Sequence, residues 1–349
     1  MSDDNASQTP LSRYERQMRF APIGETGQER LRSSRVLICG CGALGSVLAN
    51  TLARAGVGHL RLVDRDFLEF NNLQRQVLYE EADVEAAIPK AIAAAEKLRR
   101  INSNITIEPH VVDVTAGNVL ELVKNVDVIL DGTDNFETRY LLNDVSVKQS
   151  IPWIYGGCIG AEGQSITILP GKTACLRCVM PEPPPPGATP TCDTAGILGP
   201  AVNVVASYQA SEAIKILSGN ETAISRNWTI FDLWENEHRQ VSLESLSDRD
   251  CPTCQRNEFP WLDGKYGVHS AVLCGRNSVQ LSFPNQPAFG LDTLEKQLEG
   301  IGVVTRNRFL LRFHVDKYLV TVFSDGRAIV GGTEDLTEAR AVYAKYVGN

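Results

Sequence analysis

The sequence of 349 residues contains no long hydrophobic run. No uninterrupted apolar segment approaches the roughly 20 residues that a membrane-spanning helix needs, so we expect no membrane partner. The first residues, MSDDNASQTP, have neither the basic start nor the apolar core of a secretory signal peptide. From these two absences we expect a soluble, cytoplasmic protein.

Basic residues are fewer than acidic ones, 34 against 42, which gives a formal net charge of -8. Proteins that bind nucleic acids or membrane surfaces through general electrostatics usually carry an excess of Lys and Arg. The charge balance therefore argues against a nucleic-acid partner. Histidine is also scarce, with five residues, and none stands beside a nucleophile in the sequence. No histidine-based catalysis is predicted.

The chain does contain enough apolar residues for a large core, and it has many cysteines. Hydrophobic residues make up 43% of the sequence, and a chain of this length commonly forms one large domain with a smaller one. In a cytosolic protein, nine cysteines indicate metal or thiol chemistry rather than a disulfide framework.

Strand and helix patterns alternate through the first half of the chain. An apolar strand at Arg35–Cys39 precedes a glycine-rich turn and a helix at Ala43–Ala55, and the segments GHLRLVD and PKAIAAAEKLRRIN read as the next strand and helix. This alternation predicts an α/β fold with a Rossmann-like mixed, mostly parallel sheet and helices on both faces. The ligand crevice of such a sheet lies at the carboxyl ends of its strands.

The pattern changes after residue 171. Four consecutive prolines in MPEPPPPGATPTCDTAG predict an extended stretch, and a helix at 202–218 follows. The end of the chain alternates with a period of two, contains an Asp-Gly turn and finishes in a helical pattern, which predicts a small α+β module. The expected division is a disordered N-terminus at 1–10, a nucleotide-binding domain at 11–258 and a C-terminal domain of unknown role at 259–349.

The segment VLICGCGALGSVLANTLARAGVGHLRLVDRD, at 36–66, has the pattern of a dinucleotide-binding unit. Gly40, Gly42 and Gly45 allow a tight turn that brings backbone N–H groups and a helix N-terminus near phosphate. Asp64 follows at the end of the second strand, where its carboxylate can accept both ribose hydroxyls. By itself this motif is equally compatible with a nicotinamide or flavin enzyme.

The residues after this motif favour a triphosphate. Asn72, Arg75 and Lys90 come soon after the ribose carboxylate, and Asp134 with Asn135 ends a later strand. Together they supply cations for phosphates and a carboxylate for Mg²⁺. Taken singly, Arg75 and Lys90 are also compatible with ordinary surface charges.

Two short cysteine motifs predict a metal site. Cys175 and Cys178 form CLRC, and Cys251 and Cys254 form CPTC. Two such pairs provide the four thiolates of a closed tetrahedral zinc site. Because the pairs are far apart in the sequence, an unpaired CxxC acting as a redox dithiol is the alternative.

The motifs RYERQ, GCGALGS, AGVGHLRLVDRD, NNLQRQ, PKA and LDGTDN occur in order from Arg13 to about Cys254. As a set they resemble the ThiF/MoeB group of the ubiquitin-activating-enzyme-like superfamily, adenylyltransferases that activate small ubiquitin-like sulfur carriers. The resemblance makes 11–258 a ThiF/MoeB-like adenylyltransferase domain. It implies ATP and Mg²⁺ as cofactors and a structural Zn²⁺ at the four cysteines.

The resemblance also implies roles by position. Asp64 would hold the ribose, Asn72, Arg75 and Lys90 would bind the phosphates, and Asp134 would ligate Mg²⁺. Ala43 stands where the family often has another glycine. The residues expected around the nucleotide are Gly40, Gly42, Ala43, Gly45, Asp64, Asp66, Asn72, Leu73, Gln74, Arg75, Lys90, Asp134 and Asn135.

Two further residues complete the expected catalytic set of Arg16, Arg75, Lys90, Asp134 and Cys192. Arg16 in RYERQ would reach the ATP of a partner subunit, which implies a homodimer. Cys192 precedes a helical pattern, and a thiol near a helix N-terminus is a better nucleophile because its pKa is lowered. It resembles the family's crossover-loop cysteine, which bonds covalently to the carrier in some members. An unreactive loop cysteine is the alternative.

These features predict ATP-dependent adenylylation of the C-terminal glycine of a ThiS- or MoaD-like sulfur carrier, with release of pyrophosphate, for thiamine or molybdenum-cofactor sulfur transfer. The expected partners are that carrier, a second copy of the chain, and a cysteine desulfurase or another sulfur donor. One alternative is an enzyme of the same superfamily that activates a tRNA or a small-molecule carboxylate. Another is a non-catalytic scaffold that binds a ubiquitin-like protein.

Overall fold

The structure is a computed structural model. It describes residues 11–185, 192–246, 250–266, 270–273, 277–281, 290–323 and 326–348. The chain divides into two compact units, Met1–Tyr266 and Gly267–Asn349. The N-terminus predicted to be disordered, 1–10, lies outside the described residues.

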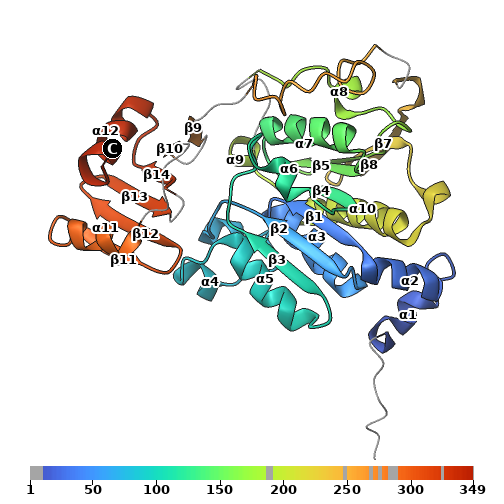
Figure 1. Cartoon of the computed structure of the whole chain (residues 1–349), viewed down its shortest axis with the longest axis horizontal. Coiled ribbons are helices and arrows are strands. Elements are labelled where there is room, and N and C mark those ends of the chain that lie inside the picture. The colour runs from blue at the N-terminus through green and yellow to red at the C-terminus, as the bar shows by residue number, and fades with distance from the viewer. Residues whose placement is uncertain are drawn as a thin grey trace, which may run out of the picture. The chain divides into compact units, whose positions relative to one another are not determined.

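The larger unit is built on an eight-stranded sheet with the order β3-β2-β1-β4-β5-β6-β7-β8 (Figure 1). The pairs from β3 to β5 are parallel, and those from β5 to β8 are antiparallel. The predicted mixed, mostly parallel sheet is therefore confirmed. Its strands are β1 (Arg35–Cys39), β2 (His59–Val63), β3 (Thr106–His110), β4 (Val128–Asp131), β5 (Trp153–Ile159), β6 (Glu162–Ile168), β7 (Asn227–Asp232) and β8 (Glu237–Ser242).

Helices cover both faces of this sheet and bury a separate apolar cluster on each (Figure 1). On one face lie α2 (Gly24–Ser33), α3 (Ala43–Ala55), α5 (Lys90–Ile101) and α10 (Gly199–Ser218), and on the other lie α6 (Val119–Leu122) and α7 (Phe136–Gln149). The alanines of α5 are fully buried, and small side chains let a helix lie close to its neighbours. The helix predicted at 202–218 begins three residues earlier, because Pro200 fits the first turn, where an N–H group is not needed.

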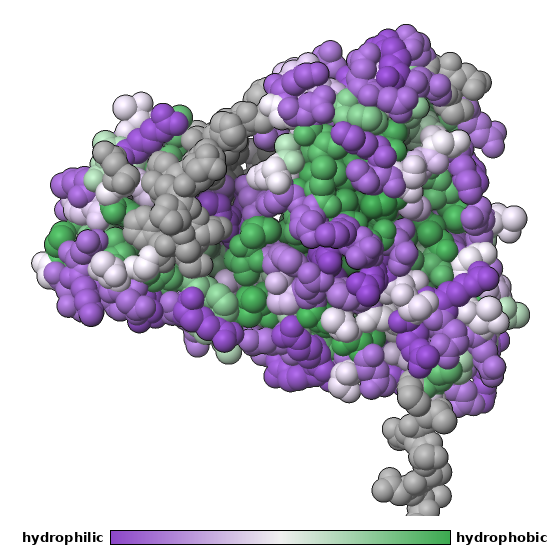
Figure 2. Space-filling view, viewed as in Figure 1, coloured by the Kyte–Doolittle hydropathy of each residue, from purple (hydrophilic) through white to green (hydrophobic). Residues whose placement is uncertain are grey.

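Short helical segments connect these elements: η1 (Ser12–Tyr14), α1 (Glu15–Met18), η2 (Phe70–Asn72), α4 (Glu81–Glu85), α8 (Leu176–Val179), α9 (Cys192–Ala195), η3 (Glu221–Ala223) and η4 (Glu244–Leu246). Both η2 and α4 begin with reciprocal side-chain and backbone hydrogen bonds, which satisfy N–H groups that a helix end leaves without partners. On the face of the larger unit seen in Figure 2, hydrophobic areas are broken up by hydrophilic residues.

The smaller unit has its own antiparallel sheet and its own apolar core. The strand order is β11-β12-β13-β14-β10-β9, and Asp335 caps the last helix by accepting from two backbone N–H groups. The predicted α+β module is confirmed. Its elements are β9 (Ser270–Leu273), β10 (Ser278–Leu281), α11 (Leu291–Leu298), β11 (Val303–Arg306), β12 (Leu310–Val315), β13 (Tyr318–Phe323), β14 (Ala328–Gly331) and α12 (Leu336–Tyr346).

The segment at 259–266, which we had expected to begin the C-terminal domain, is part of the larger unit. The backbone N–H groups of Trp261 and Leu262 donate to the Asp144 carboxylate of α7, at 2.9 and 3.3 Å. The Trp261 ring also lies 5.4 Å from that of Tyr140. These contacts tie the segment to α7. Among the described residues, no helix is both long and apolar enough to span a membrane.

Candidate functional site

The three glycines of the turn between β1 and α3 have different surroundings. Gly40 has a φ of +87°, and a Cβ atom there would lie 2.5 Å from the carbonyl oxygen of Gly132. A Cβ atom on Gly45 would lie 1.8 Å from the carbonyl oxygen of Gly40. A Cβ atom on Gly42 would meet only Gln76 Nε2, at 3.8 Å. Gly40 and Gly45 therefore allow the backbone to pack, whereas Gly42 leaves space beside the start of α3.

This space suits a phosphate group. Gly42 is the N-cap residue of α3 and has no side chain that could bond to the first N–H groups of the helix. A helix N-terminus of this kind attracts anions through those N–H groups and the helix dipole. Beside it, Gln76 is buried, and its Oε1 atom has no hydrogen-bond partner among the described residues. The open turn fits an anionic phosphate, whereas the unpaired Gln76 oxygen is an acceptor and would need a donor group of the ligand.

Acidic residues and one lysine meet at the carboxyl end of β2. Asp64 accepts hydrogen bonds from the N–H groups of Cys41 and Asp66, both at 2.7 Å, so it also holds the glycine turn in place. Lys90 begins α5, is 4% exposed, and has its Nζ 3.2 Å from Asp66 Oδ2. Burial raises the pKa of Asp64, and the positive charge of Lys90 opposes that rise.

The segment FNNLQRQ forms η2 and the loop after it. Asn72 is 2% exposed; its side-chain oxygen accepts from the N–H of Glu69, and its amide donates to Asn71 Oδ1 at 2.7 Å. Arg75 donates to the carbonyl oxygen of Asn71 at 2.8 Å. The backbone of Gln74 lies next to Gly199, where a Cβ atom would be 3.2 Å from the Gln74 carbonyl oxygen. The loop therefore lies close to the start of α10.

The structure adds a residue that the sequence did not single out. The Tyr79 hydroxyl is buried and donates to the carbonyl oxygen of Cys41 at 2.6 Å. It therefore connects the loop after η2 to the glycine turn. No sequence motif marks this tyrosine, because its role depends on a contact between segments 38 residues apart.

The loop after β4 lies against the glycine turn. The N–H of Gly132 donates to the carbonyl oxygen of Cys39 at 2.7 Å. Asp134 and Asn135 follow and are exposed, and the side-chain oxygen of Asn135 caps α7 by accepting from Thr138 N at 2.8 Å. Glycine turn, Asp64, Asp66, Lys90 and the Asp134 loop thus meet at one edge of the sheet, where a crevice was predicted.

Arg16 is not brought to this crevice within one chain. It is exposed on α1, and its neighbour Gln17 donates to the carbonyl oxygen of Ala55, at the C-terminal end of α3. The glycine turn lies at the other end of that helix, and a 13-residue helix is about 20 Å long.

The four cysteines of the two CxxC motifs come together, as predicted. Their Sγ atoms all lie within 4.8 Å of one another, and the Cys175–Cys178, Cys175–Cys251 and Cys178–Cys254 separations are 3.8, 3.6 and 3.4 Å. A tetrahedral site with Zn–S bonds of about 2.3 Å has sulfurs about 3.8 Å apart. The cluster therefore has a geometry that fits a metal ion.

Residues of α7 hold both halves of this cluster. Asn143 accepts from the N–H of Leu176 at 2.8 Å, which fixes the first CxxC. Asp144 accepts from the Thr253 hydroxyl at 3.4 Å and from the N–H of Trp261 at 2.9 Å, which fixes the second. Burial raises the pKa of Asp144 to about 6, although these hydrogen bonds oppose the rise.

Cys192 is the first residue of α9, and its side chain lies outside the described part of the chain. The segment that follows is joined to the end of β5: the N–H of Gly160 donates to the carbonyl oxygen of Gly196 at 3.0 Å, and Leu198 N donates to Gly160 O at 2.8 Å.

Comparisons with known proteins agree with this architecture. A model described as the ThiF family matches residues 14–253. The sulfur carrier protein ThiS adenylyltransferase of Bacillus subtilis (strain 168) is 45% identical over 338 residues, which are 96% of this chain and 99% of that protein. The sulfur carrier protein adenylyltransferase of Thermus thermophilus is 38% identical over 249 residues, 70% of this chain and 90% of that protein.

Among solved structures, E. coli MccB crystallised with ATP is similar, with a TM-score of 0.57 and 24% identity. The match covers 66% of this chain and 71% of that chain. At this identity the likeness concerns the fold alone.

Proposed function

The chain belongs to the ThiF family, and we propose that it is an ATP-dependent adenylyltransferase acting on a small ubiquitin-like sulfur carrier of the ThiS or MoaD type. The terminal glycine carboxylate of the carrier attacks the α-phosphorus of ATP. An acyl-adenylate forms, and pyrophosphate leaves. The product serves sulfur transfer for thiamine or molybdenum-cofactor synthesis.

The observation that carries this proposal is the arrangement of residues around the glycine turn, at the carboxyl ends of β1 and β2. Gly42 leaves the start of α3 open, and the buried Lys90 lies within 3.2 Å of Asp66 at the same edge of the sheet. Both the attacking carboxylate and the triphosphate are anions, so the barrier is lowered by cations that are already in place before the reaction. Lys90, Arg75 and the N–H groups of α3 bind and orient the phosphates, with Asn72 beside them.

The remaining crevice residues orient the rest of ATP. Asp64, with Asp66 beside it, takes the ribose hydroxyls, and Ala43, Leu73 and Gln74 line the space around the nucleotide. Asp134 would hold Mg²⁺, an ion that neutralises phosphate charge. Its exposed carboxylate on a fixed loop is a donor of the chemical type that Mg²⁺ prefers. The carboxylate nucleophile comes from the substrate, so adenylylation itself needs no protein nucleophile.

The test is to incubate the protein with ATP, Mg²⁺ and a ThiS- or MoaD-type carrier. We expect carrier-dependent ATP–pyrophosphate exchange and a carrier heavier by one adenylyl group (AMP less one water) in mass spectrometry. A carrier that lacks its terminal glycine is the matched control and should support neither signal. If NADH bound tightly while ATP with Mg²⁺ did not bind, the proposal would be wrong. Activation of a tRNA or small carboxylate in place of the carrier would favour the alternative substrate class.

We propose that a second copy of the chain completes the site. Arg16 lies at the far end of α3 from the glycine turn of its own chain, so only another subunit can bring it to an ATP. Mixing Arg16→Ala with Lys90→Met should restore about a quarter of wild-type exchange, because half the dimers are mixed and each has one complete site. If the two variants were shown to form mixed dimers and the mixture still had no pyrophosphate exchange activity, this arrangement would be refuted.

The cysteine cluster is proposed to hold Zn²⁺ as a structural ion. Closed sites with four cysteine ligands are structural because no coordination position is left for a substrate. Metal analysis should give one zinc per chain.

We also propose that the protein is located in the cytoplasm and that a cysteine desulfurase or another sulfur donor acts after it. Cys192 is proposed to act after adenylylation: its thiolate attacks the acyl carbon of the carrier adenylate, the acyl–phosphate bond breaks, and AMP leaves as the thioester forms.

A further inference from the structure

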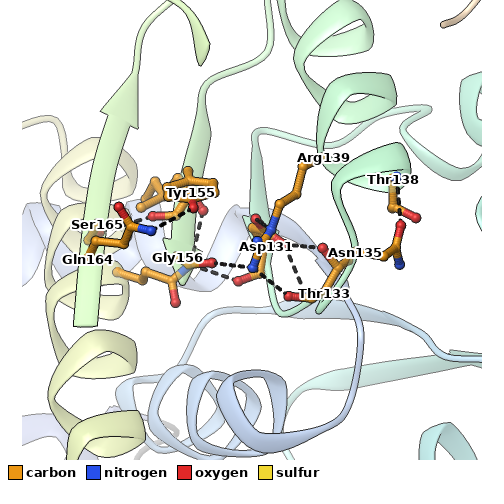
Figure 3. A network of polar contacts seen from close by, with 11 residues as sticks. Asp131, Thr133, Asn135, Thr138, Arg139, Tyr155, Gly156, Gln164 and Ser165 are labelled. Carbon is orange, nitrogen blue, oxygen red and sulfur yellow. Dashed lines mark hydrogen bonds and ion pairs between the residues drawn. The ribbon is translucent and has the colours of Figure 1, made fainter. Parts of the chain in front are cut away.

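Asp131 and Arg139 form an ion pair behind the loop that carries Asp134. Asp131 ends β4 and is 0% exposed, and Arg139 lies on α7 and is 8% exposed. The Arg139 Nε–Asp131 Oδ2 distance is 3.3 Å. Figure 3 shows the two side chains directed toward each other from these elements. Neither atom has a well-directed hydrogen bond among the described residues, so the attraction is mainly between charges.

Both members of the pair also bond to the loop itself. Asp131 Oδ1 accepts from the backbone N–H and the hydroxyl of Thr133, at 2.9 and 2.7 Å. Arg139 donates to the carbonyl oxygen of Thr133 at 2.9 Å and to that of Gly156, on β5, at 3.1 Å (Figure 3). One guanidinium group thus joins α7, the loop and the neighbouring strand.

The opposite side of the loop is fixed by backbone packing. A Cβ atom on Gly132 would lie 2.6 Å from the carbonyl oxygen of Gly40 and 3.1 Å from Gly45 Cα. The loop therefore fits between the glycine turn and Arg139. A shift of the loop in either direction would break hydrogen bonds or create a steric clash.

Burial of this ion pair costs desolvation free energy, and a buried ion pair is often no more stable than apolar residues of similar volume. Stability alone therefore does not explain why the pair is present. Arg139 lies over the rings of Tyr155 and Phe136, at 5.1 and 5.4 Å, so a long apolar side chain would also fit its surroundings. Asp134 directly follows Thr133, the loop residue whose carbonyl oxygen accepts from Arg139. Asp131 supplies the counter-charge from inside, which leaves the Asp134 carboxylate available to a ligand.

We propose that Arg139 and Asp131 are positioning residues, which fix the loop at 132–135 and thereby hold Asp134 for Mg²⁺ at the glycine turn. This inference rests on the proposed function, because Mg²⁺ is the ion required with ATP. Neither residue needs to touch the substrate. Their effect is on where Asp134 lies and on which cation it faces.

The test compares Arg139→Lys and the milder Thr133→Val with Tyr140→Phe as the control. Tyr140 is the next residue on α7 and donates to the carbonyl oxygen of Met180, away from the loop, so its variant loses a partly buried hydrogen bond made by the same helix. Thr133→Val keeps the side-chain shape and removes one hydrogen bond to Asp131.

The first readout is amide hydrogen exchange over residues 132–138 in the full chain. We expect faster exchange in both test variants and wild-type exchange in Tyr140→Phe. The second is the Mg²⁺ concentration giving half-maximal pyrophosphate exchange, which should rise about tenfold in Arg139→Lys, with kcat largely recovered at saturating Mg²⁺.

The inference would be overturned if Arg139→Lys had a lower melting temperature while amide hydrogen exchange of the loop and the Mg²⁺ dependence of pyrophosphate exchange were unchanged. Only a structural role would then remain. The hydrogen-exchange readout needs no turnover. If wild-type protein showed no pyrophosphate exchange, the proposed function would fail on that result. Unprotected loop amides in wild-type protein would count separately against the positioning role.

Discussion

The nucleotide crevice and the four-cysteine cluster are both assembled from motifs that are far apart in the sequence, but they use their polar groups in opposite ways. In the crevice, Asp64, Asp66 and Lys90 hold one another and the backbone, while Gly42 leaves one side open. In the cluster, the Sγ atoms lie within 4.8 Å of one another, and α7 fixes both segments from outside.

With the proposed roles, this difference would separate turnover from stability within one fold. A site that admits a substrate keeps donors that are oriented but not fully used, whereas a closed metal site uses all its donors on one ion. Changes in the crevice should therefore affect rate more than stability. Changes in the cluster should affect stability more than rate.

The largest expected effect on rate is that of Lys90→Met. Loss of a fixed cation next to the triphosphate should slow pyrophosphate exchange by about 10²- to 10³-fold, by analogy with other preorganised donors. Lys97→Met is the matched control, because Lys97 lies on the same helix but pairs with Glu80 and Asp83 at 2.5 and 2.8 Å. If the rate of pyrophosphate exchange fell equally in the two variants, the role of Lys90 in binding the triphosphate would be contradicted.

Changes at the cysteine cluster should lower stability more than the rate of pyrophosphate exchange. Addition of a chelator, or Cys251→Ser, is expected to lower the melting temperature by about 10 °C or more, because a metal bound at the proposed site would contribute directly to folding. Calorimetry measures the shift, and Cys158→Ser controls for loss of a half-buried thiol outside the cluster. A protein that loses exchange activity on chelation while keeping its melting temperature would contradict a purely structural role.

Two neighbouring glycines separate the two kinds of effect within the crevice itself. Gly45→Ala should destabilise the fold by about 2 kcal/mol or more, because its Cβ would lie 1.8 Å from a backbone oxygen. Gly42→Ala should fold normally and raise the KM for ATP, since its Cβ enters the open space. Urea unfolding and exchange kinetics measure both, and a reversed order would refute the roles given to the two glycines.

The smallest effect is expected for Cys192→Ser. Because the carrier supplies its own carboxylate, ATP–pyrophosphate exchange should not change, whereas an enzyme-linked carrier in mass spectrometry should disappear. Loss of exchange in this variant would mean that Cys192 acts in the adenylylation step rather than after it.

Much of the fold could be predicted because its signals are local. The strand Arg35–Cys39 and the helix Ala43–Ala55 have the predicted bounds, since apolar periodicity and the glycines specify them without help from other segments. The end of the larger unit was misplaced for the opposite reason. Trp261 and Leu262 are held by Asp144, a residue more than a hundred positions earlier, and no composition change marks that contact.

The site divides in the same way. The glycines, the acidic residues and the cysteine pairs could be predicted because they occur in short sequence motifs that indicate their chemistry. Tyr79 and Arg139 were missed, because each looks like an ordinary core or helix residue until its partner is known. Asp131 lies in the LDGTDN motif, but its role was not predicted because that role depends on Arg139. Arg16 was recognised, but only the structure places it at the far end of α3 from the glycine turn.

The sequence by itself determined the kind of chemistry, the α/β class and the metal-type cysteine pairs, because residue type and short spacing decide which ligands a segment can bind. Tertiary structure alone decided which glycine leaves space for a ligand, how the two CxxC motifs meet, and which buried charges balance each other. These properties depend on distances between segments that are remote along the chain, and such distances are set by packing of the whole sheet and its helices.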